Sequence, residues 1–385
     1  MDFAFTPKQT ELQQWVRQIA EEKIAPIAEE ADESPTVHAG LMAILANEGL
    51  LRYCVPEEYG GAGVRVMDLC IIREELARVS CQADTNFIMQ GLGSYPITLG
   101  GTHEQKAKYL PAIARGESIA AFALTEPHAG SDVISMKTEA KLDGDDWILN
   151  GSKKFISQAG DASTYTVFAQ TEPGQGSRGI SVFVVEAGTP GFDDSKRMDL
   201  MAAHPIGEPR WDDCHVPQGN LLGERGRGLR LAMGTLDTFR TTVAAAAIGM
   251  AQAAYEATID FAKNRQMFGQ TLADFQATQF KLADMAVNLD AARLLAQRGH
   301  VRPHSASFAS GRRVAVQVGP PAGQLASGRV RSARKPGRRV LADCVASRAG
   351  ILTGVAAVRA RDAGVVGAAE REPVADVVIR LRRSA

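Results

Sequence analysis

The residues with the clearest chemical potential lie between Phe122 and Ser135, in the stretch Phe-Ala-Leu-Thr-Glu-Pro-His-Ala-Gly-Ser-Asp-Val-Ile-Ser. A β-rich run ends in Thr-Glu-Pro, and a turn through Gly130 follows, with Ser131 and Asp132 beside it. Such a turn exposes backbone amides and small hydroxyl groups together, which suits a planar, hydrogen-bonding ligand that carries phosphates. An ordinary loop between strands is the alternative, because such loops are also rich in Gly, Ser and Asp.

A second candidate segment runs from Asn150 to Ser157 as Asn-Gly-Ser-Lys-Lys-Phe-Ile-Ser. Phe155 and Ser157 place an aromatic ring and a hydroxyl group two residues apart, at the end of a predicted strand. Taken alone, the two residues fit the core and the surface of a strand. They lie about 30 residues after the first segment, and the two interpretations, a strand and a ligand site, both stay open at this point.

Two further segments bring a cation close to an acidic or aromatic residue. Asp237 and Arg240 stand three positions apart, which allows an ion pair on one face of a helix. Arg265 precedes a Phe-Gly pair at Phe268, and Gln276 lies seven residues past that glycine. Arginine supplies a delocalised cation for pyrophosphate, and phenylalanine supplies a flat apolar contact. The structural alternatives are an exposed ion pair and a basic helix end.

Composition bounds the class of protein. With 385 residues, 45% hydrophobic and 23% charged, the chain is long enough for two or three domains with a large core. Five cysteines show no CxxC pairing and seven histidines show no HExxH spacing, so we expect neither a zinc site nor a disulfide framework, and a reducing cytoplasm fits. We also expect no membrane segment, because the N-terminus lacks the regions of a signal peptide and no apolar run reaches spanning length. The Gly-rich runs do not fit GxGxxG between a strand and a helix, which excludes a Rossmann site.

Helical patterns fill residues 1–120. Thr6-Pro7-Lys8-Gln9 is typical of a capped helix start, and Pro26 predicts the end of that helix. Helical spacing of apolar residues then recurs at 41–51, 66–80 and 105–114. We therefore predict an N-terminal helical domain over 1–120.

The period of the pattern changes after residue 120. Between 121 and 224, short alternating or apolar runs are separated by Asp-Gly, Gly-Asp and Pro-Gly turns, which predicts an antiparallel β domain. These runs are 137–141, 147–150, 165–171 and 179–186. From 225 to 300 the pattern is helical again, in two long segments broken around residues 267–269.

Residues 301–385 differ in composition from the rest of the chain. They hold 15 Arg, one Lys and five acidic residues, a net charge of +11, whereas the first 300 residues sum to −12. They contain no Met, Tyr or Trp. A GC-rich gene read out of frame would give this composition. A nucleic-acid-binding tail is the alternative. The segment lacks interleaved aromatic residues and any nucleic-acid-binding motif, so we expect no nucleic-acid partner. We predict that this segment packs poorly, because little apolar area offsets an ordering entropy of about 1 to 2 kcal/mol per residue.

The stretch that begins at Phe122 resembles the signature of the acyl-CoA dehydrogenase family, in which a small residue, Leu, Thr, Glu, two variable residues, a small residue, Gly, Ser and Asp occur in that order. The order of helices, strands and helices also resembles that family. The resemblance implies an α+β fold with an N-terminal helical domain, a central antiparallel β domain and a C-terminal helical bundle. It covers residues 1–298 and then stops, so the bundle is predicted to be incomplete.

The family is flavin-dependent, and its members take two hydrogens from Cα and Cβ of an acyl thioester. The resemblance therefore implies FAD as the cofactor. It assigns backbone or hydroxyl contacts with the flavin to Phe122, Leu124 and Thr125. It places Phe155 over one face of the isoalloxazine and Ser157 at the ring edge.

The same resemblance implies contacts with the substrate and with a second subunit. Ser131 would touch the pantetheine or phosphate part of the ligand, and Asp237 and Arg240 would line the acyl-CoA pocket. The segment from Arg265 to Gln276, with Phe268 at its centre, would reach across a subunit interface to the neighbouring flavin. The active unit is then expected to be a homodimer or homotetramer, provided that the interface survives in this chain.

No catalytic residue is assigned. In an intact relative a carboxylate removes the pro-R α proton while the β hydrogen leaves as hydride to flavin N5. Some relatives carry a catalytic Glu immediately before the Arg that matches Arg240, but this chain has Phe239 there. A Tyr-Glu-Gly-Thr-like segment, which usually holds the base, is absent after residue 298, as is the Gly-Gly-x-Gly segment that contacts the partner's flavin.

The sequence thus predicts an FAD-dependent acyl-CoA dehydrogenase of fatty acid metabolism whose activity is impaired by the missing base. Its substrate would be acyl-CoA or another acyl thioester, and electron-transfer flavoprotein would accept the electrons. Two alternatives remain: a non-catalytic flavin or acyl-thioester binding protein, and a relative that uses reduced flavin with oxygen. Acyl chain length and branching do not follow from the residues.

Overall fold

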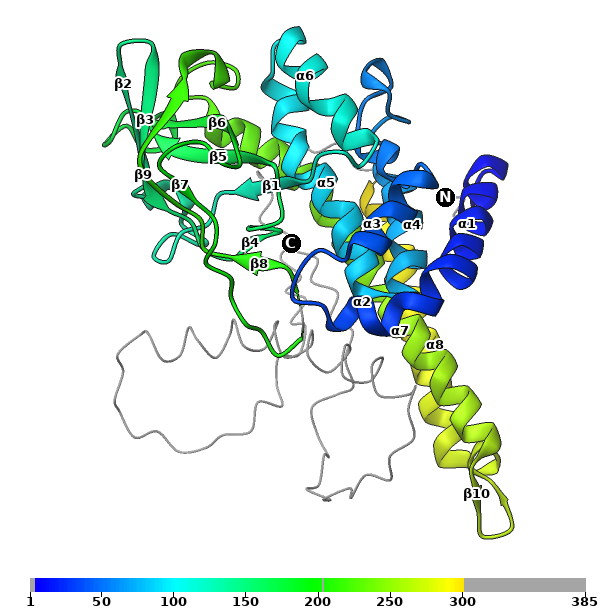
Figure 1. Ribbon diagram of the computed structural model, residues 1–385. Helices are drawn as coiled ribbons and strands as arrows, with labels where there is room; N and C mark the ends of the chain where they lie inside the picture. Colours follow the sequence, from blue (N-terminus) through cyan, green and yellow to red (C-terminus); the bar gives the residue numbers. More distant parts are fainter. Residues whose placement is uncertain (1–3, 203, 301–385) are drawn as a thin grey trace, which may run out of the picture.

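The computed structural model describes residues 4–202 and 204–300. Helices fill the N-terminal third, a β sheet follows, and a pair of long helices ends the described part (Figure 1). The predicted fold class is confirmed in this order of helices, strands and helices. The predictions about residues 301–385, that they pack poorly and that they derive from an altered reading frame, lie outside the described residues.

The first helix starts as the sequence predicts. Thr6 Oγ1 accepts a hydrogen bond from the Gln9 amide, and Gln9 Oε1 accepts one from the Thr6 amide, which completes a capping box. The prediction that Pro26 ends this helix is wrong, because the chain continues in helical turns over Ala20–Ile24 and Ala25–Ile27. Proline fits near the start of a new turn, where its missing N–H costs no hydrogen bond. The N-terminal helices are α1 (Pro7–Ile19), α2 (Ala28–Glu33), α3 (Ala39–Asn47), α4 (Val66–Val79), α5 (Cys81–Gly100) and α6 (His103–Ala114).

The helix α5, central to this domain, is not marked by the apolar pattern of the sequence. Its buried face carries polar side chains, among them Asp84, Gln90 and Ser94, so no apolar periodicity marks it. These groups find partners in the fold: Arg73 donates to Asp84 at 2.6 and 2.8 Å, and Gln90 Oε1 accepts from the Ala120 amide at 3.0 Å. The helix predicted over 41–51 is also shorter than expected, since α3 ends at residue 47 and a 3-10 helix, Leu50–Cys54, follows.

The β domain is one seven-stranded sheet with a small two-stranded sheet, β4 with β8, beside it. The order along the sheet is β1-β5-β2-β3-β9-β7, and β6 pairs with β5. The predicted antiparallel hairpins are present, but β1 pairs with β5 in parallel, because the chain passes through β2, β3 and β4 before it returns. The strands are β1 (Ala120–Ala123), β2 (Glu139–Asp143), β3 (Asp146–Ser152), β4 (Ile156–Ser157), β5 (Thr164–Gln170), β6 (Ile180–Glu186), β7 (Phe192–Asp193), β8 (Ile206–Gly207) and β9 (Arg210–Pro217).

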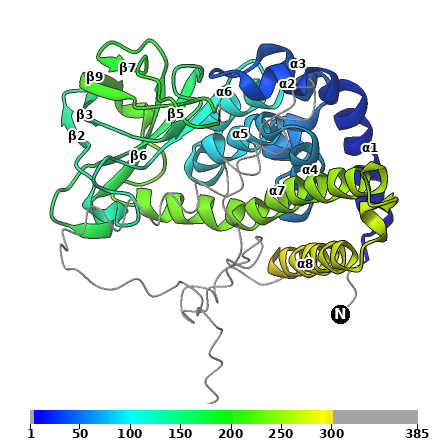
Figure 2. The same ribbon diagram turned by 90° about the horizontal axis from the view of Figure 1, so that it is seen from below.

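Two long helices close the described chain. The helix α7 (Gly228–Asn264) runs from the β domain along the N-terminal helices, and α8 (Gln276–His300) returns beside its second half (Figure 2). Between them, β10 (Gln266–Met267) and β11 (Gln270–Thr271) form a hairpin. The predicted break around 267–269 is therefore confirmed as a turn.

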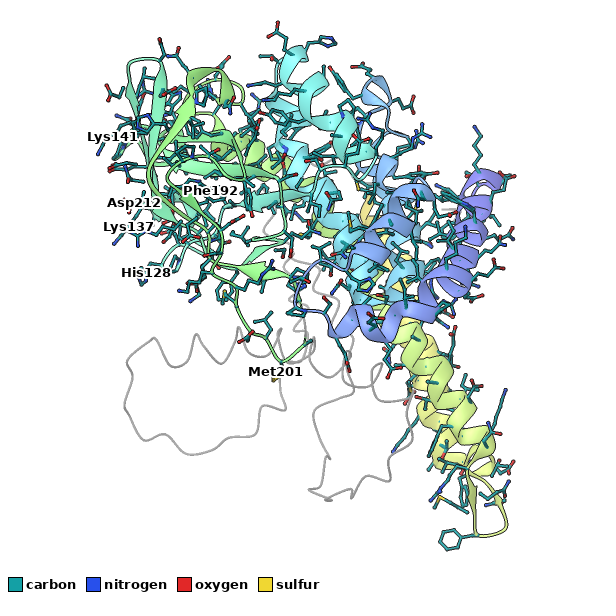
Figure 3. The ribbon with its side chains drawn as sticks, viewed as in Figure 1. His128, Lys137, Lys141, Phe192, Met201 and Asp212 are labelled. Atoms are coloured by element: carbon teal, nitrogen blue, oxygen red, sulfur yellow. The ribbon has the colours of Figure 1, made fainter. Side chains whose placement is uncertain are left out.

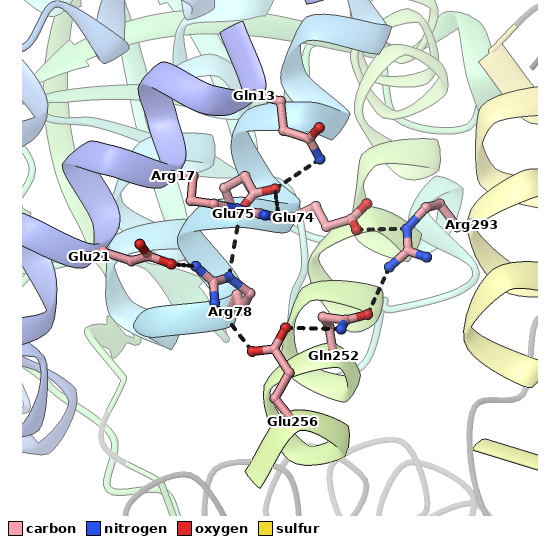
Figure 4. Close-up of polar contacts among 9 residues, drawn as sticks. All are labelled: Gln13, Arg17, Glu21, Glu74, Glu75, Arg78, Gln252, Glu256 and Arg293. Carbon is pink, nitrogen blue, oxygen red and sulfur yellow. Dashed lines mark hydrogen bonds and ion pairs between the residues drawn. The ribbon is translucent and has the colours of Figure 1, made fainter. Parts of the chain in front are cut away.

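Charged side chains join α1, α4, α7 and α8 (Figure 4). On α4, Glu75 accepts from Arg17 of α1 at 2.8 and 2.9 Å, and Glu74 accepts from Arg293 of α8 at 2.9 Å. Arg78 donates to Glu256 of α7 at 3.2 Å. Because the groups share partners, their contribution to stability is cooperative rather than a sum of separate pairs.

The packing of α7 against α4 yields a prediction about stability. A Cβ atom at Gly249 of α7 would lie 2.1 Å from the carbonyl oxygen of Glu74, so Gly249→Ala must push the two helices apart. We expect this change to lower the free energy of unfolding by about 1 to 3 kcal/mol in urea unfolding. Gly234→Ala, on the same helix, would meet only the end of the Leu99 side chain at 3.0 Å and should be near neutral. Equal effects of the two changes would contradict the close helix contact.

Candidate functional site

The site begins at the turn that follows β1. The Glu126 amide donates to the Ala129 carbonyl at 3.1 Å and the Ala129 amide donates back at 3.2 Å, so the chain reverses within four residues. Leu124 is buried and Thr125 is half-buried at the entrance of this turn, whereas Ser131 is exposed beyond it. Gly130 has no φ in the left-handed region and open space around it, so the turn does not depend on a glycine there.

The second predicted segment lies beside this turn. The Lys154 amide donates to the Thr125 carbonyl oxygen at 2.8 Å, which joins the two segments through their backbones. Phe155 follows with φ 60°, a strained conformation for a bulky residue, and its ring is 53% exposed. An exposed ring held in a strained backbone contributes little to the core, which is typical of a residue kept for a ligand.

Ser157 contacts a residue that the sequence analysis did not name. Its Oγ atom lies 3.0 Å from Nε2 of His204, on the segment that leads into β8, and Ser157 itself pairs with Ile206. Figure 3 shows Met201, which is 82% exposed, at the tip of the loop that carries this segment. No pattern in the sequence marks His204, because it precedes a proline in an irregular stretch.

A buried ion pair lies under the turn. The Nζ atom of Lys153, whose side chain is fully buried, donates to Oε1 of Glu126 at 2.8 Å. Burial disfavours the charge on Glu126, but Lys153 and hydrogen bonds from Lys137 and Thr138 outweigh this, so the pKa of the Glu126 carboxyl is lowered. Burial also lowers the pKa of Lys153, to about 8, against the attraction of Glu126.

The start of α7 brings the third predicted segment toward the turn. Leu236 packs into the same apolar cluster as Phe122 and Leu124. One residue later, Asp237 pairs with Arg240, as the i,i+3 spacing predicts. The helix begins at Gly228, so this pair lies in its third turn.

Phe239 is part of the packing rather than a reactive group. It is 4% exposed and meets Tyr95 of α5 edge-on, with ring centroids 5.3 Å apart. A Cβ atom at Gly91 would lie 2.6 Å from the Phe239 ring, so the ring fills its space tightly. The phenyl group has no proton to exchange, so Phe239 contributes packing at this position.

The fourth predicted segment does not meet the others within one chain. Arg265, Phe268 and Gln276 are exposed at the far end of α7 and α8, where the β10-β11 hairpin projects from the body (Figure 1). Phe268 and Gly269 form its two-residue turn with φ 51° and 79°, and the Phe268 ring is 91% exposed. Such a ring has no role in the fold of its own chain.

Other kinds of site find no support in the described part of the chain. A hollow of about 360 Å³ is lined by residues that include Met42, Ile119 and Asp161, and by none of the predicted site residues. Among residues 4–202 and 204–300, no three metal-ligating side chains gather as a metal site requires. None of the helices described is long and apolar enough to cross a bilayer.

The chain is similar in sequence to known proteins along most of its length. The family models described as "Acyl-CoA dehydrogenase, N-terminal domain", "middle domain" and "C-terminal domain" match residues 6–117, 121–214 and 226–307. A protein of Mycobacterium leprae named "Probable acyl-CoA dehydrogenase fadE25" is 38% identical over 356 residues, which covers 89% of this chain and 91% of the relative. The matched part of this chain is therefore longer than residues 1–298, the range that the family motifs cover.

Solved structures agree with the sequence comparison. A glutaryl-CoA dehydrogenase from Mycobacterium smegmatis in complex with FADH2 aligns with a TM-score of 0.72 and 32% identity, over 77% of this chain and 76% of that one. A chain of the structure described as "Electron transferring flavoprotein of Acidaminococcus fermentans: Towards a mechanism of flavin-based electron bifurcation" aligns with a TM-score of 0.75 and 40% identity. It covers 79% of this chain and 82% of that chain.

The backbone of Phe155 gives a prediction for the protein without ligand. Phe155→Gly removes an exposed ring and relieves a positive φ. The free energy of unfolding should therefore either rise or fall by less than about 1 kcal/mol. Ile156→Ala, one residue along and 2% exposed, should cost about 2 to 5 kcal/mol. Urea unfolding of both variants measures the contrast. A loss for Phe155→Gly as large as that for Ile156→Ala would show that the ring serves packing.

Proposed function

Because the chain belongs to the acyl-CoA dehydrogenase family, we propose that it binds FAD and acts on the Cα–Cβ bond of an acyl thioester. The observation that carries this proposal is the 2.8 Å hydrogen bond from the Lys154 amide to the Thr125 carbonyl. It joins the two segments to which the resemblance assigns the flavin, although they are far apart in the sequence. An ordinary loop between strands, with no ligand to bind, would not need the Lys154 segment held beside it.

The residues at this junction fit a flavin. Thr125 offers a hydroxyl and a backbone carbonyl at the turn, with Phe122 and Leu124 leading into it, and Phe155 offers a flat, half-exposed ring. Ser157 offers a hydroxyl that His204 orients at 3.0 Å. The chemistry that FAD supplies when bound is acceptance of the β hydrogen as hydride. The chain's own part is to hold the ring system and to exclude water from it.

The substrate would lie between the turn and α7. Ser131 is exposed beyond the turn and suits the pantetheine or phosphate part of a thioester ligand. Asp237 and Arg240 pair on α7, next to the apolar cluster that contains Leu236. In this proposal the ion pair fixes the guanidinium of Arg240, so that it meets the ligand in one orientation.

The two carboxylates nearest to the proposed flavin segments, Glu126 and Asp237, are each engaged in an ion pair, so neither is offered as a base for the α proton. Glu126 is committed to Lys153, and Asp237 is committed to Arg240. The position that holds a catalytic Glu in some relatives holds the buried ring of Phe239. We therefore propose that dehydrogenation by this chain is slow, and the same observation favours a second candidate function, a non-catalytic flavin or acyl-thioester binding protein.

The hairpin and α8 support a proposal about assembly. Arg265, Phe268 and Gln276 lie too far from the turn to serve their own chain, so we propose that they contact the flavin of a second subunit. Along α8, apolar side chains at heptad spacing are exposed: Phe280 at 61%, Val287 at 68% and Leu294 at 42%. A homodimer or homotetramer would bury this stripe.

We also propose that electron-transfer flavoprotein accepts the electrons, that the protein has a role in fatty acid metabolism and that its location is cytoplasmic. The structural similarity to a chain of the Acidaminococcus fermentans structure supports the first of these. The location rests on the spacing of the cysteines. The family names support a thioester of CoA as the substrate.

The proposed activity is tested by anaerobic mixing of the FAD-loaded protein with short, medium and branched acyl-CoAs. We expect bound flavin that bleaches about 10²- to 10⁴-fold more slowly than in a relative that has its base. Phe239→Glu should speed the bleaching, whereas Phe239→Gln should not. Both variants lose the edge contact with Tyr95, so their comparison isolates the carboxylate. Rapid bleaching of the wild-type flavin would show that another base exists.

The assembly is tested by sedimentation velocity. Val287→Glu places a charge in the apolar stripe of α8 and should shift the protein to a smaller species. Asn288→Glu, one residue along and roughly 100° around the helix from the stripe, adds the same charge and should disturb the assembly less. A wild-type protein that sediments as a monomer would contradict the proposal.

A further inference from the structure

The carboxylate of Glu126 gathers donors from two other segments. Its Oε2 atom accepts from the Lys137 amide at 2.6 Å, and its Oε1 atom accepts from the Thr138 amide at 2.9 Å. Its third donor is the ammonium of Lys153 at 2.8 Å. One side chain therefore connects the turn after β1 to the approach to β2 and to the segment after β3. Each of its oxygens is engaged, so its position is fixed.

Lys153 depends on this carboxylate in turn. Its side chain is fully buried, and within the described part of the chain its ammonium has one other polar contact, the Met136 sulfur at 3.8 Å. Glu126 is the charged group that acts on the Lys153 ammonium. The next residue, Lys154, pairs with a different carboxylate, that of Glu208, at 2.9 Å. A buried ammonium without a counter-ion is strongly unfavourable, so loss of either partner leaves the other in a costly state.

The pair stands directly behind the residues proposed to hold the flavin. Glu126 follows Thr125, and Lys153 stands two residues before Phe155. The Lys154 amide, between them, makes the hydrogen bond to the Thr125 carbonyl. Phe155 holds φ 60°, which persists only when its surroundings fix the backbone. The two members of the ion pair flank this hydrogen bond, one on each segment.

We propose that Glu126 and Lys153 are positioning residues of the flavin site, which hold Thr125 and Phe155 at the separation that the cofactor requires. The inference rests on the proposed function, since it concerns the same site. The pair touches no ligand itself. It acts by fixing the backbone of the two segments that do, which is how a supporting layer of residues prepares a binding site.

The role predicts a dependence of FAD binding on pH. Burial lowers the pKa of Lys153 to about 8, so the ion pair is intact below that pH and is lost as pH rises through it. The carboxylate of Glu126 then lacks its charged partner, and the two segments are less firmly joined. A role in general stability alone would not move the affinity for FAD in this window.

The test is the FAD dissociation constant of the full chain, from fluorescence titration at a series of pH values on both sides of pH 8. We expect the wild type to bind more weakly as pH rises through 8, and Lys153→Met to bind about 10- to 100-fold more weakly with a flat profile. Lys141→Met removes an exposed lysine of the same domain, 2.7 Å from Glu139, and should behave as the wild type.

A second variant covers a failure of Lys153→Met to fold. The double variant Glu126→Gln with Lys153→Met leaves no unpaired charge, and it should also bind FAD weakly and without pH dependence. If either variant folds and shows the FAD dissociation constant and the pH dependence of the wild type, the positioning role is overturned, even if the variant unfolds at a lower temperature. A wild type that binds no FAD would overturn the proposed function as well, so the two failures are distinguishable.

Discussion

The buried pair of Glu126 and Lys153 is the constraint on which the rest of the site depends. Two charged side chains lie buried together, where each is tolerated only because the other is present. The backbone amides of Lys137 and Thr138 add to the stabilisation of the carboxylate. As a result, three stretches of chain that are separated in sequence keep a fixed arrangement, and an exposed aromatic residue, Phe155, can be held in a strained conformation between them.

The helices provide the support for this arrangement. The backbone of α5 lies against β1, since a Cβ atom at Gly93 would lie 2.6 Å from the Ala120 carbonyl carbon. The polar side chain of Gln90 connects α5 to the amide of Ala120 and to Gln158. The buried polar face of α5 thus fixes the strand from which the turn begins. The long helix α7 adds the apolar cluster around Leu124 and carries the Asp237 pair to the same region.

Local signals in the sequence predicted much of this fold. Capping at Thr6, the short alternating or apolar β runs and the Phe-Gly turn at 268 each have a cause within a few residues, and the structure has the capped helix, the strands and the turn at these places. The helix α5 could not be predicted in this way, because its buried polar residues are paired with distant partners. The prediction that the first helix ends at Pro26 failed for the opposite reason: the local signal is present, but helical turns continue through this proline.

The candidate site was predicted in part. The resemblance marked Thr125 and Phe155, and the structure joins their segments. Nothing in the sequence distinguishes Lys153 from Lys154, although one is buried and the other is not. Likewise, His204 is near Ser157 only because β8 pairs with β4. Such residues are found from topology, which composition and spacing do not contain.

Hydrogen exchange of the protein with and without FAD tests the central claim most directly. If the turn after β1 and the segment from Lys153 to Ser157 form one cofactor site, FAD should slow exchange in both together, above all at the amide of Lys154. Exchange in α2, away from these segments, should not change. Slower exchange in only one of the two segments, or in neither, would contradict the account.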